Sequence, residues 1–276
     1  MKQWILSGMA ICITLLSCQK EIDWSTGTEN ALLIRSVQKS GSDSVVVDYT
    51  YDGSGRLIFE KTVGMSQGID VGNDLQILRD GSGNITRTIQ KSQVLISAGI
   101  DSIVTNYNYS TSNNRYTSAV FDMTIFGFTV TDSAAYQYDA SGNISGEEHY
   151  LKFPPAPFIL SFKQEYTYAG GNLSSVKQYS YDPTAMAYDL IATTTYTYDA
   201  KTTPLRLQRE AVILGRPVYF GSNNATRMDF VDATDPSNNF TTDFVYSYDI
   251  SSNKPLTAVS TQNPPGTVSN ITYYYQ

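Results

Sequence analysis

Histidine and cysteine are almost absent from this sequence of 276 residues, which contains one histidine, His149, and two cysteines, Cys12 and Cys18. A single histidine excludes every metal site built from several imidazoles, and any Ser-His-Asp triad would have to use His149. Basic residues are also scarce, because 19 Lys and Arg stand against 26 Asp and Glu, for a formal net charge of −7. This balance argues against nucleic acid as a partner, since phosphate-backbone binding needs clustered cations.

Long apolar runs are lacking as well. The stretch from Trp4 to Leu16 is uncharged and mostly apolar, but its roughly 13 residues are too few to cross a bilayer. It follows Lys2 and ends in Leu15-Leu16-Ser17-Cys18, which resembles a bacterial lipobox, where cleavage precedes the cysteine and the thiol is acylated. The alternative is an ordinary secretory signal with an incidental cysteine.

The lipobox interpretation predicts three parts of the chain. Residues 1–17 are a lipoprotein signal peptide, residues 18–30 are the lipidated Cys18 and a polar tether, and residues 31–276 are a single β-repeat domain. The predicted partner of the N-terminus is a membrane, reached through the lipid anchor. Glu21 and Asp23 behind the cysteine resemble the surface-export signal of some Gram-negative lipoproteins. The predicted location is therefore the outer membrane, lipid-anchored and surface-exposed, with the inner leaflet as the alternative.

Tyrosine is abundant, and most of the 21 tyrosines belong to a repeat. Aromatic-x-aromatic-Asp segments occur at 49–52, 136–139, 179–182, 196–199 and 246–249, with degenerate copies such as Leu78-Arg79-Asp80. The Asp-equivalent positions 52, 80, 110, 139, 169 and 199 lie 28 to 30 residues apart. The next copy comes 50 residues later, which indicates an insertion or an eroded unit between 199 and 249.

Each repeat has the pattern of a β-hairpin. The segment from Val45 to Tyr51 alternates with period 2, and Asp52-Gly53-Ser54-Gly55 follows as a turn in which Asp caps and the late Gly takes a positive φ. We predict an all-β fold, an antiparallel meander of about 15–18 strands built from ~29-residue Tyr-x-Tyr-Asp hairpins and curved into a barrel-like or half-barrel sheet. The strand faces lack a lipid-facing apolar band, so this barrel is not expected to span a membrane. Glu210 to Leu214 is expected to form one helical turn.

The run from Tyr49 to Leu57 resembles the YD repeat of Rhs-type shells. A closer similarity is to lipobox-anchored Gram-negative lipoproteins of unknown function with repeated Tyr-Asp hairpins, a group described as porin-like in fold. Its C-terminal pattern is matched at residues 198–205, 219–224 and 246–249, although Thr203 stands where that pattern has Asn. The resemblance implies fold and location, and it brings no catalytic residues.

Tyrosine pairs along the strands have two interpretations. Side chains two residues apart share a face of a strand, so the rings could form an aromatic platform for sugars, for which Tyr138, Tyr168, Tyr198 and Tyr248 are the candidates. The alternative is packing in the core, where cross-strand aromatic pairs stabilise the sheet. We favour core packing, because sixteen paired rings are more than a sugar site uses.

Few other residues have the pattern of a catalytic or metal site. Glu147-Glu148-His149 could act in acid–base chemistry, but such a run is more often a solvated face. The Asp-x-Ser-Gly-Asn turns offer too few oxygens for Ca²⁺. We therefore predict no cofactor and no enzyme, but a non-catalytic, lipid-anchored cell-envelope protein that serves as a scaffold or binding module for a glycan or an envelope protein. The alternative is a carbohydrate-active hydrolase with an unidentified carboxylate pair.

Overall fold

The computed structural model describes residues 31–125 and 128–276. The predicted signal peptide at 1–17, Cys18 and the tether up to residue 30 lie outside the described residues. Within the described ranges the chain is mainly β-structure, and no helix there is long and apolar enough to cross a membrane.

The strands and helices follow one another along the chain with short connections. They are β1 (Leu33–Ser40), β2 (Asp43–Tyr51), β3 (Leu57–Ser66), β4 (Ile69–Asp70), β5 (Asn73–Arg79), β6 (Ile85–Ser92), α1 (Gln93–Ser97), β7 (Ile103–Ser110), β8 (Arg115–Ile125), β9 (Phe128–Tyr138), β10 (Ile144–Lys152), β11 (Ile159–Ala169), β12 (Asn172–Asp182), β13 (Ala187–Thr202), α2 (Glu210–Ile213), η2 (Pro217–Tyr219), β14 (Asn223–Asp232), η3 (Pro236–Asn238), β15 (Phe240–Tyr248), β16 (Pro255–Asn263) and β17 (Thr267–Tyr275).

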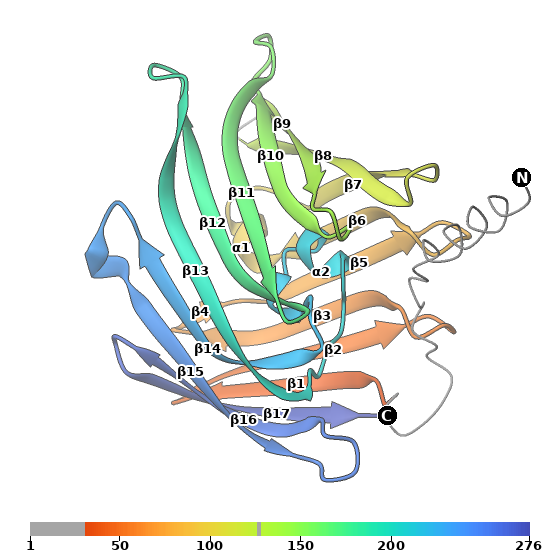
Figure 1. Ribbon diagram of the computed structural model, residues 1–276, viewed down its shortest axis with the longest axis vertical. Coiled ribbons are helices and arrows are strands. Elements are labelled where there is room, and N and C mark those ends of the chain that lie inside the picture. The colour runs from red at the N-terminus through yellow and green to blue at the C-terminus, as the bar shows by residue number, and fades with distance from the viewer. Residues whose placement is uncertain (1–30, 126–127) are drawn as a thin grey trace, which may run out of the picture. The chain divides into compact units, whose positions relative to one another are not determined.

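The sheet closes into a barrel (Figure 1). Each strand pairs antiparallel with its neighbours in sequence, and β1 pairs with β17 to complete the ring. The short β4 pairs only with β3, so sixteen strands form the closed barrel. The predicted antiparallel meander is confirmed, and closure removes the exposed edges that a half-barrel would leave.

The Asp turns at positions 52, 80, 139, 199 and 249 lie at one end of the barrel, whereas Asp182 lies at the other end. In the turn after β2, the Asp52 carboxylate accepts hydrogen bonds from the backbone N–H of Ser54 at 2.8 Å and of Arg56 at 3.0 Å. Gly55 then takes φ +75°, and Gly142 takes φ +85° in the turn after β9. The register shifts by a bulge beside each of these turns. The predicted bulged hairpin with a late glycine is therefore confirmed.

Replacing Gly142 with valine is expected to lower the free energy of unfolding by about 1–2 kcal/mol, because a β-branched residue resists the left-handed conformation. Thermal or urea unfolding measures the change. Gly53→Val is the matched control, since Gly53 has no positive φ and no atom within 4 Å of an added Cβ. Equal stability of the two variants would contradict the role assigned to the late glycine.

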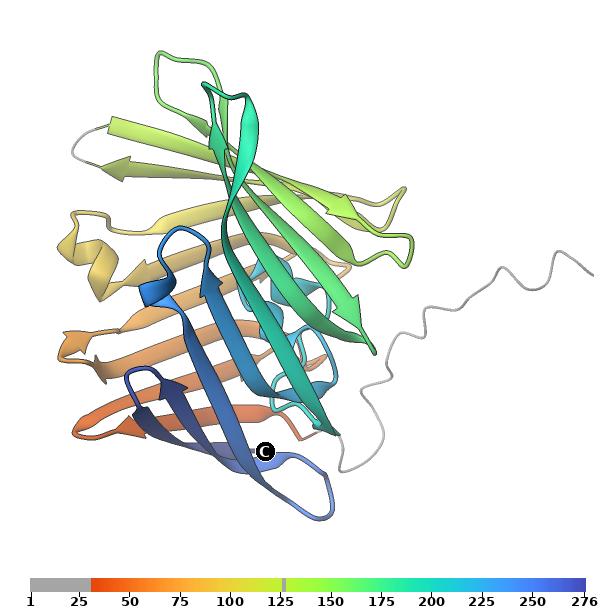
Figure 2. The same ribbon diagram turned by 60° about the vertical axis from the view of Figure 1, so that its left-hand side comes forward.

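Residues 203–222, called the insert below, leave the wall between β13 and β14 and enter the barrel. They contain α2, which confirms the predicted helical turn, and they account for the long gap between the Asp repeats at 199 and 249. Figures 1 and 2 both show α2 inside the ring of strands. Leu205, Ala211 and Val212 are buried and belong to the core cluster. The Asp-turn end is therefore the insert end of the barrel, and the opposite end is called the far end.

Most paired tyrosines face the interior, where they pack against this core. Their ring positions alternate with exposed outward residues such as Gln137 and Thr167. The pair at Tyr179 and Tyr181 is the exception and corrects the prediction of one-sided placement. Tyr179 lies opposite Lys163 on the outer wall. The other copies of the repeat end their strands at the insert end, whereas this copy ends β12 at the far end, and its tyrosines therefore fall on the alternate, outward-facing positions.

Candidate functional site

A ring of tyrosine hydroxyl groups ties five of the hairpins to the preceding hairpin at the insert end. Tyr51 donates to the backbone carbonyl of Leu33 at 2.7 Å. Equivalent bonds of 2.7–2.9 Å link Tyr138 to Tyr116, Tyr168 to Ile144, Tyr246 to Ala225 and Tyr275 to Pro255. The acceptor lies in each case at or near the start of a return strand. The sequence shows the tyrosines, but nothing in it indicates these acceptors, because they depend on the strand register.

The four predicted platform residues all face the barrel interior near the insert. The hydroxyl groups of Tyr138 and Tyr168 belong to the ring of hydrogen bonds just described, and that of Tyr248 bonds to Asp199. The Tyr198 hydroxyl is buried and has no hydrogen-bond partner among the described residues. Burial raises the pKa of all four phenols. The structure thus brings them to one end of the interior, and sugar binding there stays a prediction.

Arg79 replaces the tyrosine in the degenerate repeat copy Leu78-Arg79-Asp80. Its Nη2 donates to the carbonyl of Leu57 at 3.0 Å, which repeats the ring bond. The same guanidinium reaches Glu210 of α2 with two bonds of 2.7 and 2.8 Å, and its side chain is only 6% exposed. Burial acts against the charge, but Glu210 outweighs it and raises the pKa of Arg79. Arg79, which stands where the other copies have tyrosine, thus binds the insert through Glu210.

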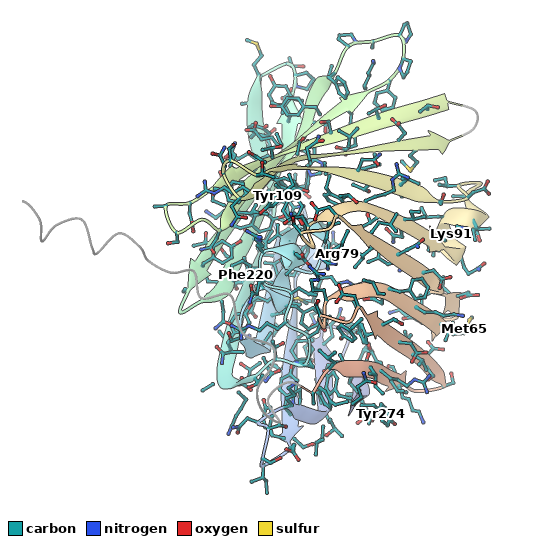
Figure 3. All side chains as sticks on the ribbon, turned by 90° about the vertical axis from the view of Figure 1, so that its right-hand side faces the viewer. Met65, Arg79, Lys91, Tyr109, Phe220 and Tyr274 are labelled. Atoms are coloured by element: carbon teal, nitrogen blue, oxygen red, sulfur yellow. The ribbon has the colours of Figure 1, made fainter. Side chains whose placement is uncertain are left out.

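Further contacts hold the insert in the barrel. Arg216 bonds to the buried carboxylate of Glu60 on β3. Tyr107 donates to the carbonyl of Ile213 at 3.2 Å, and the Phe220 ring lies 4.4 Å from that of Tyr168. In Figure 3 the labelled Arg79 and Phe220 lie within the barrel, while Met65 and Lys91 mark the far end. The insert therefore occupies the interior of the insert end.

Asp132, Glu147 and His149 form a cluster of ionisable side chains on the inner face of the barrel wall. His149 Nδ1 lies 3.0 Å from Asp132 Oδ1, and its Nε2 lies 3.6 Å from Glu147 Oε1, to which Tyr166 also donates at 2.8 Å. Glu147 is 8% exposed, so a solvated face is the wrong interpretation for Glu147 and His149. Only Glu148 of this run points to the outside, where it lies opposite Lys163. No group of three or more potential ligands in the described ranges could hold a metal ion.

The cluster predicts a pH dependence of stability. Burial opposes the imidazolium, but Asp132 and Glu147 outweigh it and raise the pKa of His149 to about 9. A group with a raised folded-state pKa contributes its full stability below its unfolded pKa of about 6.5, and the contribution disappears as the pH rises through 9. We expect wild-type protein to lose roughly 3 kcal/mol of unfolding free energy between pH 6 and 9. Urea titrations should show that His149→Gln removes this slope, and an unchanged slope would contradict the assignment.

The outer wall carries ion pairs along the strands. Arg35 on β1 bonds to Asp48 on β2, with side chains 52% and 39% exposed. Arg227 on β14 contacts Asp229 at 2.9 Å and Asp243 on β15 at 3.4 Å. The contacts of Arg227 lie in the middle of β14, whereas Arg35 is the third residue of β1. The outside of the barrel is therefore a surface with paired charges.

One region of the outer wall is aromatic. Tyr150, Tyr179, Tyr181 and Tyr188 come from β10, β12 and β13, and with Lys163 of β11 they form what we call the outer tyrosine patch. Tyr188 meets Tyr179 and Tyr181 edge-to-face, with ring centroids 6.4 and 5.4 Å apart. Lys163 Nζ lies 5.2 Å from the ring centroids of both Tyr179 and Tyr188. In the sequence, the pair at 179 and 181 is one of the repeated tyrosine pairs, and nothing there indicates this patch. The available signal is that the copy ending at Asp182 falls outside the 28- to 30-residue spacing of the repeat.

Comparison with known proteins identifies the fold. No protein-family model matches the chain, and no curated protein matches it in sequence. A porin-like protein from Bacteroides uniformis is similar in structure, with a TM-score of 0.52 at 10% identity over 88% of this chain and 98% of the other. The chain shares the porin-like barrel fold. A porin-like protein from Bacteroides vulgatus gives a TM-score of 0.54 at 11% identity over 89% and 99% of the two chains.

At these identities the likeness concerns the fold alone. The resemblance to the porin-like group is confirmed to that extent. The similarity to YD-repeat proteins and the lipoprotein assignment stay predictions.

Proposed function

We propose that this protein is a non-catalytic, lipid-anchored barrel of the outer membrane that acts as a binding module for a glycan or an envelope protein. The observation that carries the proposal is the outer wall. Arg227 lies in the middle of β14 on this wall, and an Arg on a lipid-facing barrel surface costs about 2–4 kcal/mol at the bilayer midplane. Such a wall is compatible with contact to water rather than to lipid. In this proposal the acylated Cys18 therefore attaches the protein to the membrane.

The ends of the chain support an arrangement with the insert end toward the membrane. The backbone N–H of Leu32 donates to the carbonyl of Gln276 at 3.1 Å, so both ends of the described domain lie at the insert end. Residue 31, where the described domain begins, therefore lies at this end. The far end, and the part of the outer wall next to it, would then be most accessible to a partner.

Replacing Cys18 with alanine is expected to move the protein from the membrane fraction to the soluble fraction, because each buried acyl CH₂ contributes about 0.8 kcal/mol to membrane binding. Fractionation of Gram-negative cells and detergent phase partitioning measure the change. Cys12→Ala is the control, since Cys12 lies within the predicted signal peptide and its variant should remain anchored. A Cys18→Ala protein that stays in the membrane after carbonate extraction would contradict the anchor.

A second experiment tests the water-facing wall. The purified acylated protein, added to dye-loaded liposomes, is expected to bind them without releasing the dye. Dye release at protein concentrations that saturate the liposomes would indicate a spanning pore and would overturn this part of the proposal.

A further inference from the structure

The outer tyrosine patch is a feature of the surface that the fold itself does not explain. The interior tyrosines bond to backbone carbonyls and pack against the insert, whereas these four rings lie on the solvent side of β10–β13. Leu190, 39% exposed, lies opposite Tyr179 and extends the patch. The Tyr188 hydroxyl is buried beneath the patch without a hydrogen-bond partner in the described part of the chain.

Charged groups border the rings of this patch. Tyr179 donates to Glu165 at 2.8 Å and Tyr150 donates to Glu148 at 3.1 Å. Lys163 bonds to Glu165 at 2.6 Å and lies over two of the rings. The patch therefore combines aromatic surface with hydrogen-bonding groups whose charges cancel, since the carboxylates of Glu148 and Glu165 stand against the ammonium groups of Lys163 and Lys177.

On this geometry we propose that the outer tyrosine patch is a binding site for a neutral glycan. Aromatic rings offer an apolar surface to the C–H faces of sugars, and the adjoining carboxylates and ammonium bond to hydroxyl groups. The centres of protein interfaces are depleted of Lys and Glu, so the mixture of charges within the patch favours a sugar over a protein. The balance of carboxylates and ammonium groups gives a polyanion no net attraction to the patch, which disfavours acidic polysaccharides and nucleic acid.

The patch also lies in an accessible place. Tyr181 and Tyr188 flank the connection between β12 and β13 at the far end, opposite the end where the described domain begins. This inference deepens the proposed function by naming the ligand class and its site, and it rests on that function for its biological meaning.

The test is affinity electrophoresis of the acylated protein in detergent, in native gels that contain dextran, mannan or xylan. At least one of these neutral polysaccharides is expected to retard the wild-type protein, whereas polygalacturonate is not. Tyr179→Ala/Tyr188→Ala should weaken the retardation at least tenfold. Tyr274→Ala is the matched control, because Tyr274 is a 47% exposed tyrosine on β17 outside the patch, and it should bind as wild type.

A second variant guards against a loss of fold. Tyr179→Phe/Glu165→Gln keeps both rings and should weaken retardation by roughly three- to tenfold at an unchanged melting temperature. The proposal is overturned if no neutral polysaccharide retards the protein, if only polygalacturonate does, or if the patch variants bind like Tyr274→Ala. The Cys18→Ala protein should show the same retardation as wild type, so failure of the anchor and failure of the glycan site are distinguishable.

Discussion

Replacing Arg79 with alanine is expected to lower the free energy of unfolding by about 3–5 kcal/mol. The variant leaves the carboxylate of Glu210 without its partner inside the barrel and removes the bonds to the carbonyls of Leu57 and Gly83. Removing one partner of a buried ion pair costs far more than the pair itself contributes, because the remaining charge stays desolvated. Urea unfolding at pH 7 measures the loss.

The control for this variant is Arg35→Ala. Its partner Asp48 is exposed, so a loss of less than about 1 kcal/mol is expected. The double variant Arg79→Met/Glu210→Met removes both charges and should recover most of the stability, since apolar replacement of a buried pair is often neutral. Equal losses for Arg79→Ala and Arg35→Ala would show that the insert is not held by this ion pair.

Replacing Tyr138 and Tyr168 together with alanine is expected to cost several kcal/mol of stability. Both rings pack against the core cluster and both hydroxyl groups bond to backbone carbonyls. Changes from a fully buried aromatic residue to alanine cost about 3–5 kcal/mol each, and these half-buried sites should lie toward the lower limit. Thermal and urea unfolding measure the effect.

Gln137 and Thr167 provide the matched control, because they flank the same tyrosines on the exposed face. Their replacement by alanine should cost less than about 0.5 kcal/mol each. A stably folded Tyr138→Ala/Tyr168→Ala protein that loses only sugar binding would instead favour the interior aromatic platform. The Tyr→Phe variants separate the two contributions, since each should lose about 1 kcal/mol for its hydroxyl bond.

The hairpins were predictable from the sequence because their signals are local. Alternation between Val45 and Tyr51, the Asp52 cap and the positive-φ Gly55 all act within a few residues, and the register of an antiparallel hairpin follows from its turn. Closure of the sheet was not predictable, because it depends on the pairing of β1 with β17, the first and last strands along the described sequence.

The roles of individual side chains likewise depend partly on local sequence and partly on the tertiary structure. The sequence marked Leu78-Arg79-Asp80 as a degenerate copy, but only the fold brings Glu210 to Arg79 across more than a hundred residues. The copy with Tyr179 and Tyr181 falls outside the regular spacing of the repeat. That these two rings face outward, however, depends on the end of the barrel at which their strand ends. A solvated Glu147 and His149 was the wrong expectation because the parity of β10 directs them inward, toward Asp132.

The sequence by itself determined the all-β class, the hairpin repeat, the turn geometry and the helical turn within the insert, since each depends on neighbours within one hairpin. The tertiary structure decided that the sheet closes, that the insert fills one end, and that tyrosine hydroxyl groups join successive hairpins. It also decided that four tyrosines form a patch on the outer wall. These features depend on contacts between residues far apart in the chain, where the register and the direction of each strand fix which side chains meet.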